Sequence, residues 1–140
     1  MYKRQELARA QQAQGRASVQ DALAEPRDLG EVRLVAARVP ADDRDALMQL
    51  GDHARDRIGR AGVVVLGAAW GGKATLLVTL TPDLVEAGRL HAGNLVKELA
   101  AAVGGRGGGR PGTAQAGLPD ESALDRALAQ APDIVTASLG

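Results

Sequence analysis

Residues 101–117, AAVGGRGGGRPGTAQAG, contain the residue types best suited to binding chemistry. Five of the six residues from Gly104 to Gly109 are glycine, Arg106 interrupts the run and Arg110 closes it. Glycine lets backbone N–H groups approach a ligand closely, and a guanidinium group presents paired donors to a phosphate. The stretch is therefore a candidate loop for binding phosphate or nucleic-acid backbone, and a flexible linker is the alternative.

The length of chain after this stretch argues against a linker. Only 28 residues follow Gly112, too few to fold as a domain alone. Their helix must therefore pack back on the preceding elements. Long glycine loops inside compact domains are entropically costly, so we expect this one to serve a ligand.

Two nucleotide-binding motifs do not fit the run. Gly107, Gly109 and Gly112 formally match GxGxxG, but the dinucleotide fingerprint needs a preceding strand. Here a helix precedes, and Pro111 lies inside the match. The phosphate-binding loop of nucleotide hydrolases ends in GK[ST], whereas this run ends in GRP.

No catalytic or metal-binding residues are predicted. The chain has no cysteine and two histidines. His53 lies between Asp52 and Asp56, on what we expect to be the solvated face of a helix. His91 lies near the expected start of another helix. No Ser-His-Asp set or pair of carboxylates stands out.

Composition and charge define the class of protein. The 140 residues are 45% hydrophobic with zero formal net charge, which alone argues against strong nucleic-acid binding. However, residues 1–19 and 88–117 each carry a net charge of +3, and residues 20–50 and 118–140 each carry −3. The glycine run thus lies in a basic zone, with ordinary surface charge as the alternative. Without a signal peptide or membrane span, we expect a soluble cytoplasmic protein.

The first 29 residues are predicted to form a helical arm. Leu7, Ala10, Ala17 and Ala24 lie near heptad spacing, and Pro26 lies where the helix should end. The arm looks too polar to bury itself in a core. We expect residues 30–140 to form a separate globular domain.

That domain is predicted to be of the α/β (α+β) class, a small sheet with helices packed on it. The run from Val63 to Leu66 indicates a strand covered on both faces, and Trp70 begins a WGG turn. Asp42 is expected to cap the first helix, and Pro132 to separate a last short helix. The elements expected are strands 31–39, 62–69, 73–80 and 113–117, and helices 42–60, 81–88, 91–103 and 120–131.

The segment HAGNLVKELAAAVGGRGGGRPGTAQAG, residues 91–117, resembles the signature of the C-terminal domain of alanyl-tRNA synthetase. The matching parts are AGNLVKELA, GGRGGGRP and AQAG, and GVVVLGAAWGGKATLLVTLTPDL upstream fits the same domain. The resemblance covers residues 30–140, and the polar first helix resembles the arm that joins this domain to the rest of the enzyme. Gly112 and Thr113 depart from the family, which has an acid and a bulkier residue there.

The resemblance implies a module that contacts the outer corner, or elbow, of tRNA(Ala) and supports aminoacylation and editing by other domains. It also implies a homodimer through the arm and this domain, and places ATP, Mg and Zn in other domains. The chain alone should therefore be catalytically silent and hold no cofactor. The candidate RNA-binding residues are Trp70, Lys73, His91, Asn94, Lys97, Arg106, Gly107, Gly108, Gly109 and Arg110.

Three alternatives stay open. The chain is also similar to the accessory domain of DHH-type phosphoesterases, whose glycine motif ends in a histidine where this chain has Arg110. A purely structural dimerisation domain is the other alternative to the tRNA-binding module. For Trp70, a ring lying on the sheet edge and a platform for base stacking are both considered. Salt dependence of RNA binding would separate an RNA-binding module from a dimerisation domain.

Overall fold

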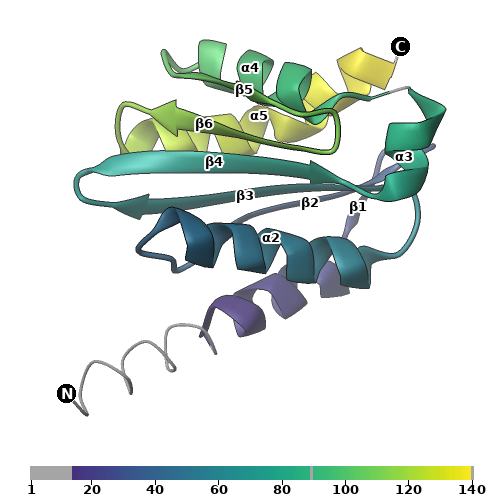
Figure 1. The fold of residues 1–140 in the computed structure, drawn as a ribbon, viewed down its shortest axis with the longest axis horizontal. Helices are drawn as coiled ribbons and strands as arrows, with labels where there is room; N and C mark the ends of the chain where they lie inside the picture. The colour runs from purple at the N-terminus through teal and green to yellow at the C-terminus, as the bar shows by residue number, and fades with distance from the viewer. Residues whose placement is uncertain (1–13, 89, 140) are drawn as a thin grey trace.

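The computed structural model describes residues 14–88 and 90–139, which form a six-stranded mixed sheet (Figure 1). The spatial order is β1-β2-β3-β4-β6-β5. β2 and β3 are parallel, whereas the other neighbouring strands are antiparallel. The strands are β1 (Arg27–Asp28), β2 (Arg33–Arg38), β3 (Gly62–Trp70), β4 (Lys73–Leu80), β5 (Arg106–Gly109) and β6 (Thr113–Leu118).

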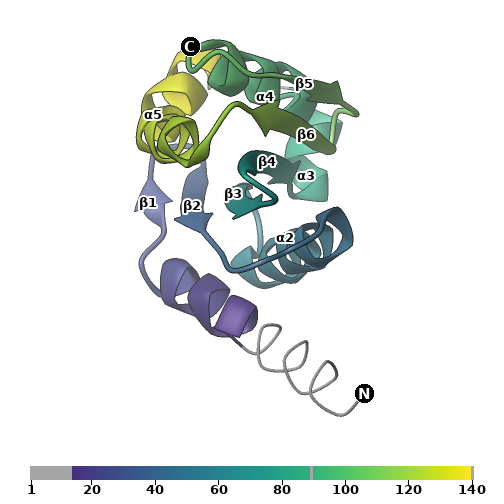
Figure 2. The same cartoon turned by 90° about the vertical axis from the view of Figure 1, so that its left-hand side faces the viewer.

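Helices cover both faces of this sheet. The crossover helix between the parallel strands packs on one face, over β3 and β4, and the last two helices pack on the other (Figure 2). The predicted fold class, a sheet with helices packed on it, is confirmed. The helices are α2 (Arg44–Ile58), α3 (Pro82–Ala87), α4 (Ala92–Ala101) and α5 (Glu121–Leu139).

The core forms two apolar layers, one on each side of the sheet. Val63 and Val65 of β3 join the layer under α4 and α5, whereas Val64 and Leu66 join the layer under α2. All four side chains are fully buried, so the predicted two-sided coverage of β3 is confirmed. Helix α2 contributes Leu47, Leu50, Ala54 and Ile58 to the layer beneath it.

The caps of two helices fix where they begin. Asp43, and not Asp42 as expected, caps α2, since its Oδ1 accepts a hydrogen bond from the backbone N–H of Ala46 at 2.7 Å. That geometry requires the acid directly before the first helical residue. His91 caps α4 in the same way, because its Nδ1 accepts from the N–H of Asn94 at 3.2 Å.

Helix α5 runs through Pro132, where a break was expected. Proline removes one backbone hydrogen bond from a helix. Ala131 and Val135, on either side of it, are both fully buried. Burial of the apolar face on both sides of the proline outweighs the lost bond, so the last two expected helices are one.

The N-terminal helical segment 14–24 packs on the domain, contrary to the expectation that the arm is too polar for burial. Val19 is fully buried in the layer that contains Leu47 and Val35. Gly15 brings the segment close to α2, because a Cβ there would lie 2.8 Å from the Cδ1 of Leu50. Leu7 and Ala10 lie outside the described residues.

His53 of α2 is half-buried, although a solvated face was expected. Its buried Nε2 makes no hydrogen bond with any described residue. Burial lowers the pKa of His53 below its usual 6.5, the positive charges of Arg57 and Arg16 lower it further, and Asp56 opposes them. Arg16 belongs to the N-terminal helical segment, so this electrostatic interaction connects that segment with α2.

We therefore expect the chain to lose stability as the pH falls below 6.5. The unfolded chain binds a proton at His53 more readily than the folded chain, so acid favours unfolding. The contribution is complete above 6.5 and is lost as the pH falls toward the lowered pKa. Urea unfolding at pH 7.5 and 5.5 should show the loss in the parent and a smaller one in His53→Leu. Equal pH dependence in both proteins would contradict this assignment.

Candidate nucleic-acid interface

The glycine run forms an edge strand, not the loop that was expected. β5 pairs with β6 from Arg106 opposite Gly117 to Gly109 opposite Ala114. The N–H of Arg110 then donates to the carbonyl of Thr113 at 3.1 Å, which extends the pairing to the turn. The run is therefore held by the sheet from Arg106 onward, and before it the N–H of Gly105 donates to the carbonyl of Ala100 at 2.7 Å.

Close packing explains two of the glycines in β5. A Cβ on Gly107 would lie 2.5 Å from both the Cα of Ala116 and the carbonyl oxygen of Gln115. A Cβ on Gly109 would lie 2.7 Å from the Cα of Ala114. These are backbone positions of the neighbouring strand, so no side chain fits between them. At these two positions the fold itself requires glycine, without any ligand.

Helix α4 lies against the same strand, and its first amide groups are already occupied. The N–H of Ala92 donates to the carbonyl of Pro111 at 2.8 Å, and that of Gly93 donates to Arg110 at 3.2 Å. Asn94 N–H donates to His91, as described above. Helix N-termini often bind anions, but here these donors satisfy the chain's own acceptors. These amide groups of α4 are therefore not free to bind a phosphate.

Two glycines near β5 are not explained by packing. A Cβ on Gly108 would meet the flexible end of Lys97, with Cε at 3.3 Å. A Cβ on Gly117 would meet no atom of the described chain within 4 Å. Neither residue has a positive φ. Both residues line an open groove.

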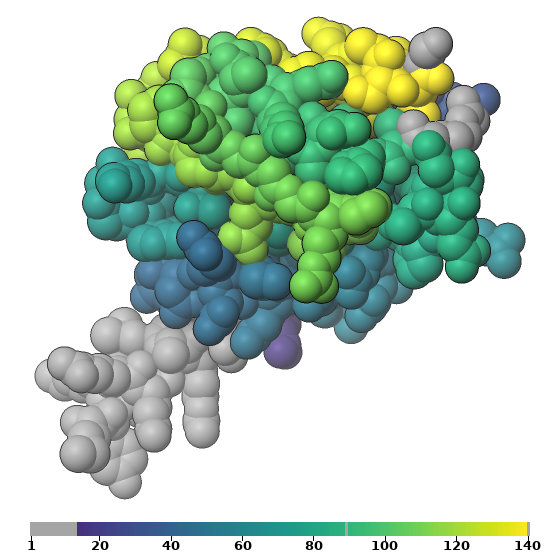
Figure 3. Space-filling view, turned by 45° about the horizontal axis from the view of Figure 1, so that its top comes forward, coloured from purple at the N-terminus to yellow at the C-terminus, as the bar shows by residue number. Residues whose placement is uncertain are grey.

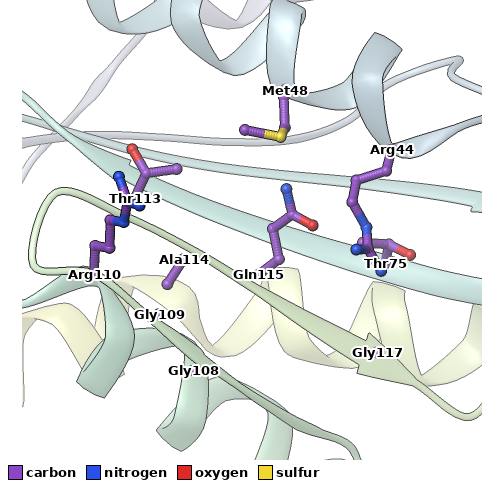
Figure 4. Close-up of a pocket in the computed structure, with 10 residues that line it drawn as sticks. All are labelled: Arg44, Met48, Thr75, Gly108, Gly109, Arg110, Thr113, Ala114, Gln115 and Gly117. Atoms are coloured by element: carbon purple, nitrogen blue, oxygen red, sulfur yellow. The ribbon is translucent and has the colours of Figure 1, made fainter.

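This groove, of about 610 Å³, lies between α2 and the β5–β6 pair, beyond the part of the sheet that α2 covers (Figure 4). Figure 3 shows the β5–β6 segment on the molecular surface between α4 and α2. Met48, which is 38% exposed, faces the groove from α2. Arg44 and Arg110 lie at its two ends, and its floor includes Thr75, Gln115 and Gly117.

Positive charge around the groove is not neutralised within the described chain. Arg44, Lys97, Arg106 and Arg110 are exposed, and none of them pairs with a carboxylate of residues 14–88 or 90–139. Among the described residues that line the groove, none is acidic. Arg38, which is not among the groove-lining residues, by contrast contacts Glu121 of α5 at 3.2 Å. The groove is thus the part of the surface best suited to an anionic ligand.

The structure brings part of the candidate set together. Gly108, Gly109 and Arg110 line the groove, and Lys97 approaches Gly108 from α4. Arg106 begins β5, and Gly107 lies packed against β6.

Four other candidates lie outside the groove lining. Trp70 and Lys73 flank the β3–β4 turn, where Trp70 is half-buried against the apolar layer beneath α2. This placement favours the ring on the sheet over a stacking platform. His91 and Asn94 form the cap of α4 described above.

Several groove residues were absent from the candidates. The alternation in TAQAG, residues 113–117, could have indicated a strand with Thr113 and Gln115 on one polar face. Arg44 could also have been identified, because a cation in the first turn of a helix opposes the helix dipole. Its presence there suggests a role in binding and not in helix stability. Met48 and Thr75 carry no such signal, since the packing of α2 beside the sheet brings Met48 here and the pairing of β4 with β6 brings Thr75.

Residues 14–88 and 90–139 hold no cluster of three or more histidine, aspartate or glutamate side chains placed to bind a metal ion. Within those ranges, no helix combines the length and apolar character needed to cross a membrane.

Comparison with known proteins places these features in context. Residues 31–137 match the DHHA1 domain family. The chain is 50% identical over 129 residues to an alanine–tRNA ligase of Herpetosiphon aurantiacus, covering 92% of this chain and 14% of that protein. It is 45% identical over 122 residues to the alanine–tRNA ligase of Acetivibrio thermocellus, covering 87% of this chain and 14% of that protein. The chain thus spans about a seventh of the length of these relatives.

The fold is similar to that of a solved domain. The crystal structure of the C-Ala domain from Aquifex aeolicus alanyl-tRNA synthetase superimposes with a TM-score of 0.68. The superposition covers 80% of this chain and 98% of that one, at 20% sequence identity. At this identity, the comparison establishes a shared fold.

Proposed function

The chain belongs to the DHHA1 domain family, and from this premise we propose that it is a tRNA-binding module of an alanine–tRNA ligase. The relatives support the choice of enzyme, because the similarity to alanine–tRNA ligases extends over about nine-tenths of this chain. The module has no proposed catalytic role of its own.

The observation that carries the RNA-binding role is the cluster of unneutralised cations around the groove. RNA backbones attract such clusters because bound phosphates release their counterions. Arg44 and Arg110 line the groove itself, whereas Lys97 and Arg106 extend the charge along α4 and β5. An arginine-lined groove without a lining carboxylate is suited to a nucleic-acid ligand.

The finer features of the proposal follow from the family resemblance. We infer that the module contacts the elbow of tRNA(Ala) and so supports aminoacylation and editing by other domains. ATP, Mg and Zn would be bound in those domains, and the assembly would be cytoplasmic. A homodimer through the arm and this domain stays a prediction.

The test is a titration of the whole chain with a tRNA(Ala) transcript at several salt concentrations. We expect the logarithm of the association constant to fall linearly with the logarithm of salt concentration, by about 0.7–0.9 per phosphate contacted. Binding that does not change with salt would contradict a backbone-contacting role. Absence of binding, together with a stable dimer, would support the structural alternative.

A further inference from the structure

We propose that the groove between α2 and β6 holds one unstacked nucleotide of the bound RNA, with its base on the bare strand surface at Gly117. The inference rests on the proposed function, and it names the part of the RNA that this site takes. Met48 and Gln115 would contact the base, while Arg44 and Arg110 would contact the flanking phosphates.

Gly117 leaves the strand surface at the floor of the groove without a side chain. It lies within β6, opposite Thr75 of β4 and Arg106 of β5. Glycine weakens a strand because it loses more backbone freedom on folding and offers no side chain to pack. Within the described chain, no close contact or positive φ requires it here. What glycine does provide is an open floor, on which a flat group can approach the backbone.

The groove above this floor matches the chemistry of a base. Its volume of about 610 Å³ is within the range of small-molecule sites. The side-chain amide of Gln115 points into the groove (Figure 4) and makes no hydrogen bond with the described residues. An amide can donate to and accept from a base edge. The Met48 thioether, on the α2 side, can contact an aromatic ring.

The position of the charges favours a nucleotide over a free base. Arg44 and Arg110 lie at opposite ends of the groove (Figure 4), so both phosphates that flank a bound nucleotide would have a cationic partner. A base stacked inside a helix cannot reach a floor beneath the Met48 side chain. Proteins that recognise RNA bases commonly select unstacked nucleotides in loops, bulges and ends.

The decisive variant is Gly117→Val. Valine favours strands and has open space at this position, so the melting temperature should stay the same or rise. The side chain would fill the floor, and binding of the tRNA(Ala) transcript should weaken about tenfold, as expected when one base contact is lost. Gly112→Ala is the matched control, because Gly112 lies outside the groove lining and has ordinary space beside Val85.

A second variant tests the same site in case Gly117→Val impairs folding. Gln115→Ala removes the amide from the floor and should also weaken binding, although less than Gly117→Val. If the parent binds tRNA with the expected salt dependence but both variants bind as tightly as the parent, the nucleotide site is wrong and the proposed function stands. If the parent shows no salt-dependent binding, the proposed function itself fails.

Discussion

Gly107→Val should detach β5 from the sheet and lower the free energy of unfolding by about 3 kcal/mol, as expected for severe overpacking. A Cβ at this position would lie 2.5 Å from the carbonyl oxygen of Gln115 and would also collide with Ala116. Both obstacles belong to the backbone or Cβ of β6, so no change of rotamer relieves them. The strand must move, and Arg106 and Arg110 at its ends would move with it.

Urea unfolding of Gly107→Val and Gly108→Ala provides the measurement and its control. Gly108 differs from its neighbour because an added Cβ would meet the mobile end of Lys97 at 3.3 Å. Alanine at 108 should therefore change stability by no more than about 0.5 kcal/mol. Equal stability of both variants and the parent would show that β5 does not depend on this packing, and that the glycines need another explanation.

This contrast between neighbouring glycines shows what the sequence could predict about the run. Composition predicted that the backbone at Gly104–Gly109 approaches a ligand, whereas Gly107 and Gly109 pack against β6. It could not indicate that this neighbour is a strand of the sheet, because glycine is depleted in strands and a loop was the natural expectation. The pairing with β6 is a contact between segments on either side of a turn. Only the three-dimensional structure shows that Gly107 and Gly109 face neighbouring backbone.

The remaining fold followed largely from local pattern. The apolar run in β3 and the stripe on α2 were predictable because each reflects periodic burial. The predictions of a helix break at Pro132 and of an unburied N-terminal arm were wrong for the same reason. Both considered local propensity alone and not the surface on which each segment packs. Val19 is the fully buried side chain of the segment, and Ala22 and Leu23 pack beside it on the same layer. A heptad count of the alanines passes over Val19.

The candidate site was predicted on one side only. Arg110 and its neighbouring glycines were found because they are adjacent in sequence. The opposite wall comes from α2, more than 50 residues earlier in the chain. The crossover from β2 to β3 positions Arg44 and Met48 beside a strand that follows much later. A local sequence pattern cannot indicate a contact between segments that are so far apart in the chain.

Replacing both arginines at the ends of the groove, Arg44→Ala with Arg110→Ala, should weaken tRNA(Ala) binding about a hundredfold. A hydrogen bond to a charged group contributes about 1.5 kcal/mol at the low end of its range, and two such losses give this factor. The salt dependence should also decrease by about one phosphate contact for each arginine. Stability should be preserved, because both side chains are exposed and Arg44 opposes the dipole of α2.

The control for this double variant removes the same charge elsewhere. Arg57 and Arg126 are exposed and lie outside the groove lining, so Arg57→Ala with Arg126→Ala has the same net charge as the test protein. If the groove binds the backbone, the control should keep most of the parent's affinity and its salt slope. If both double variants lose affinity equally, tRNA responds only to the overall charge of the domain. Retention of parental affinity by the Arg44 and Arg110 variant would instead place the RNA on another face.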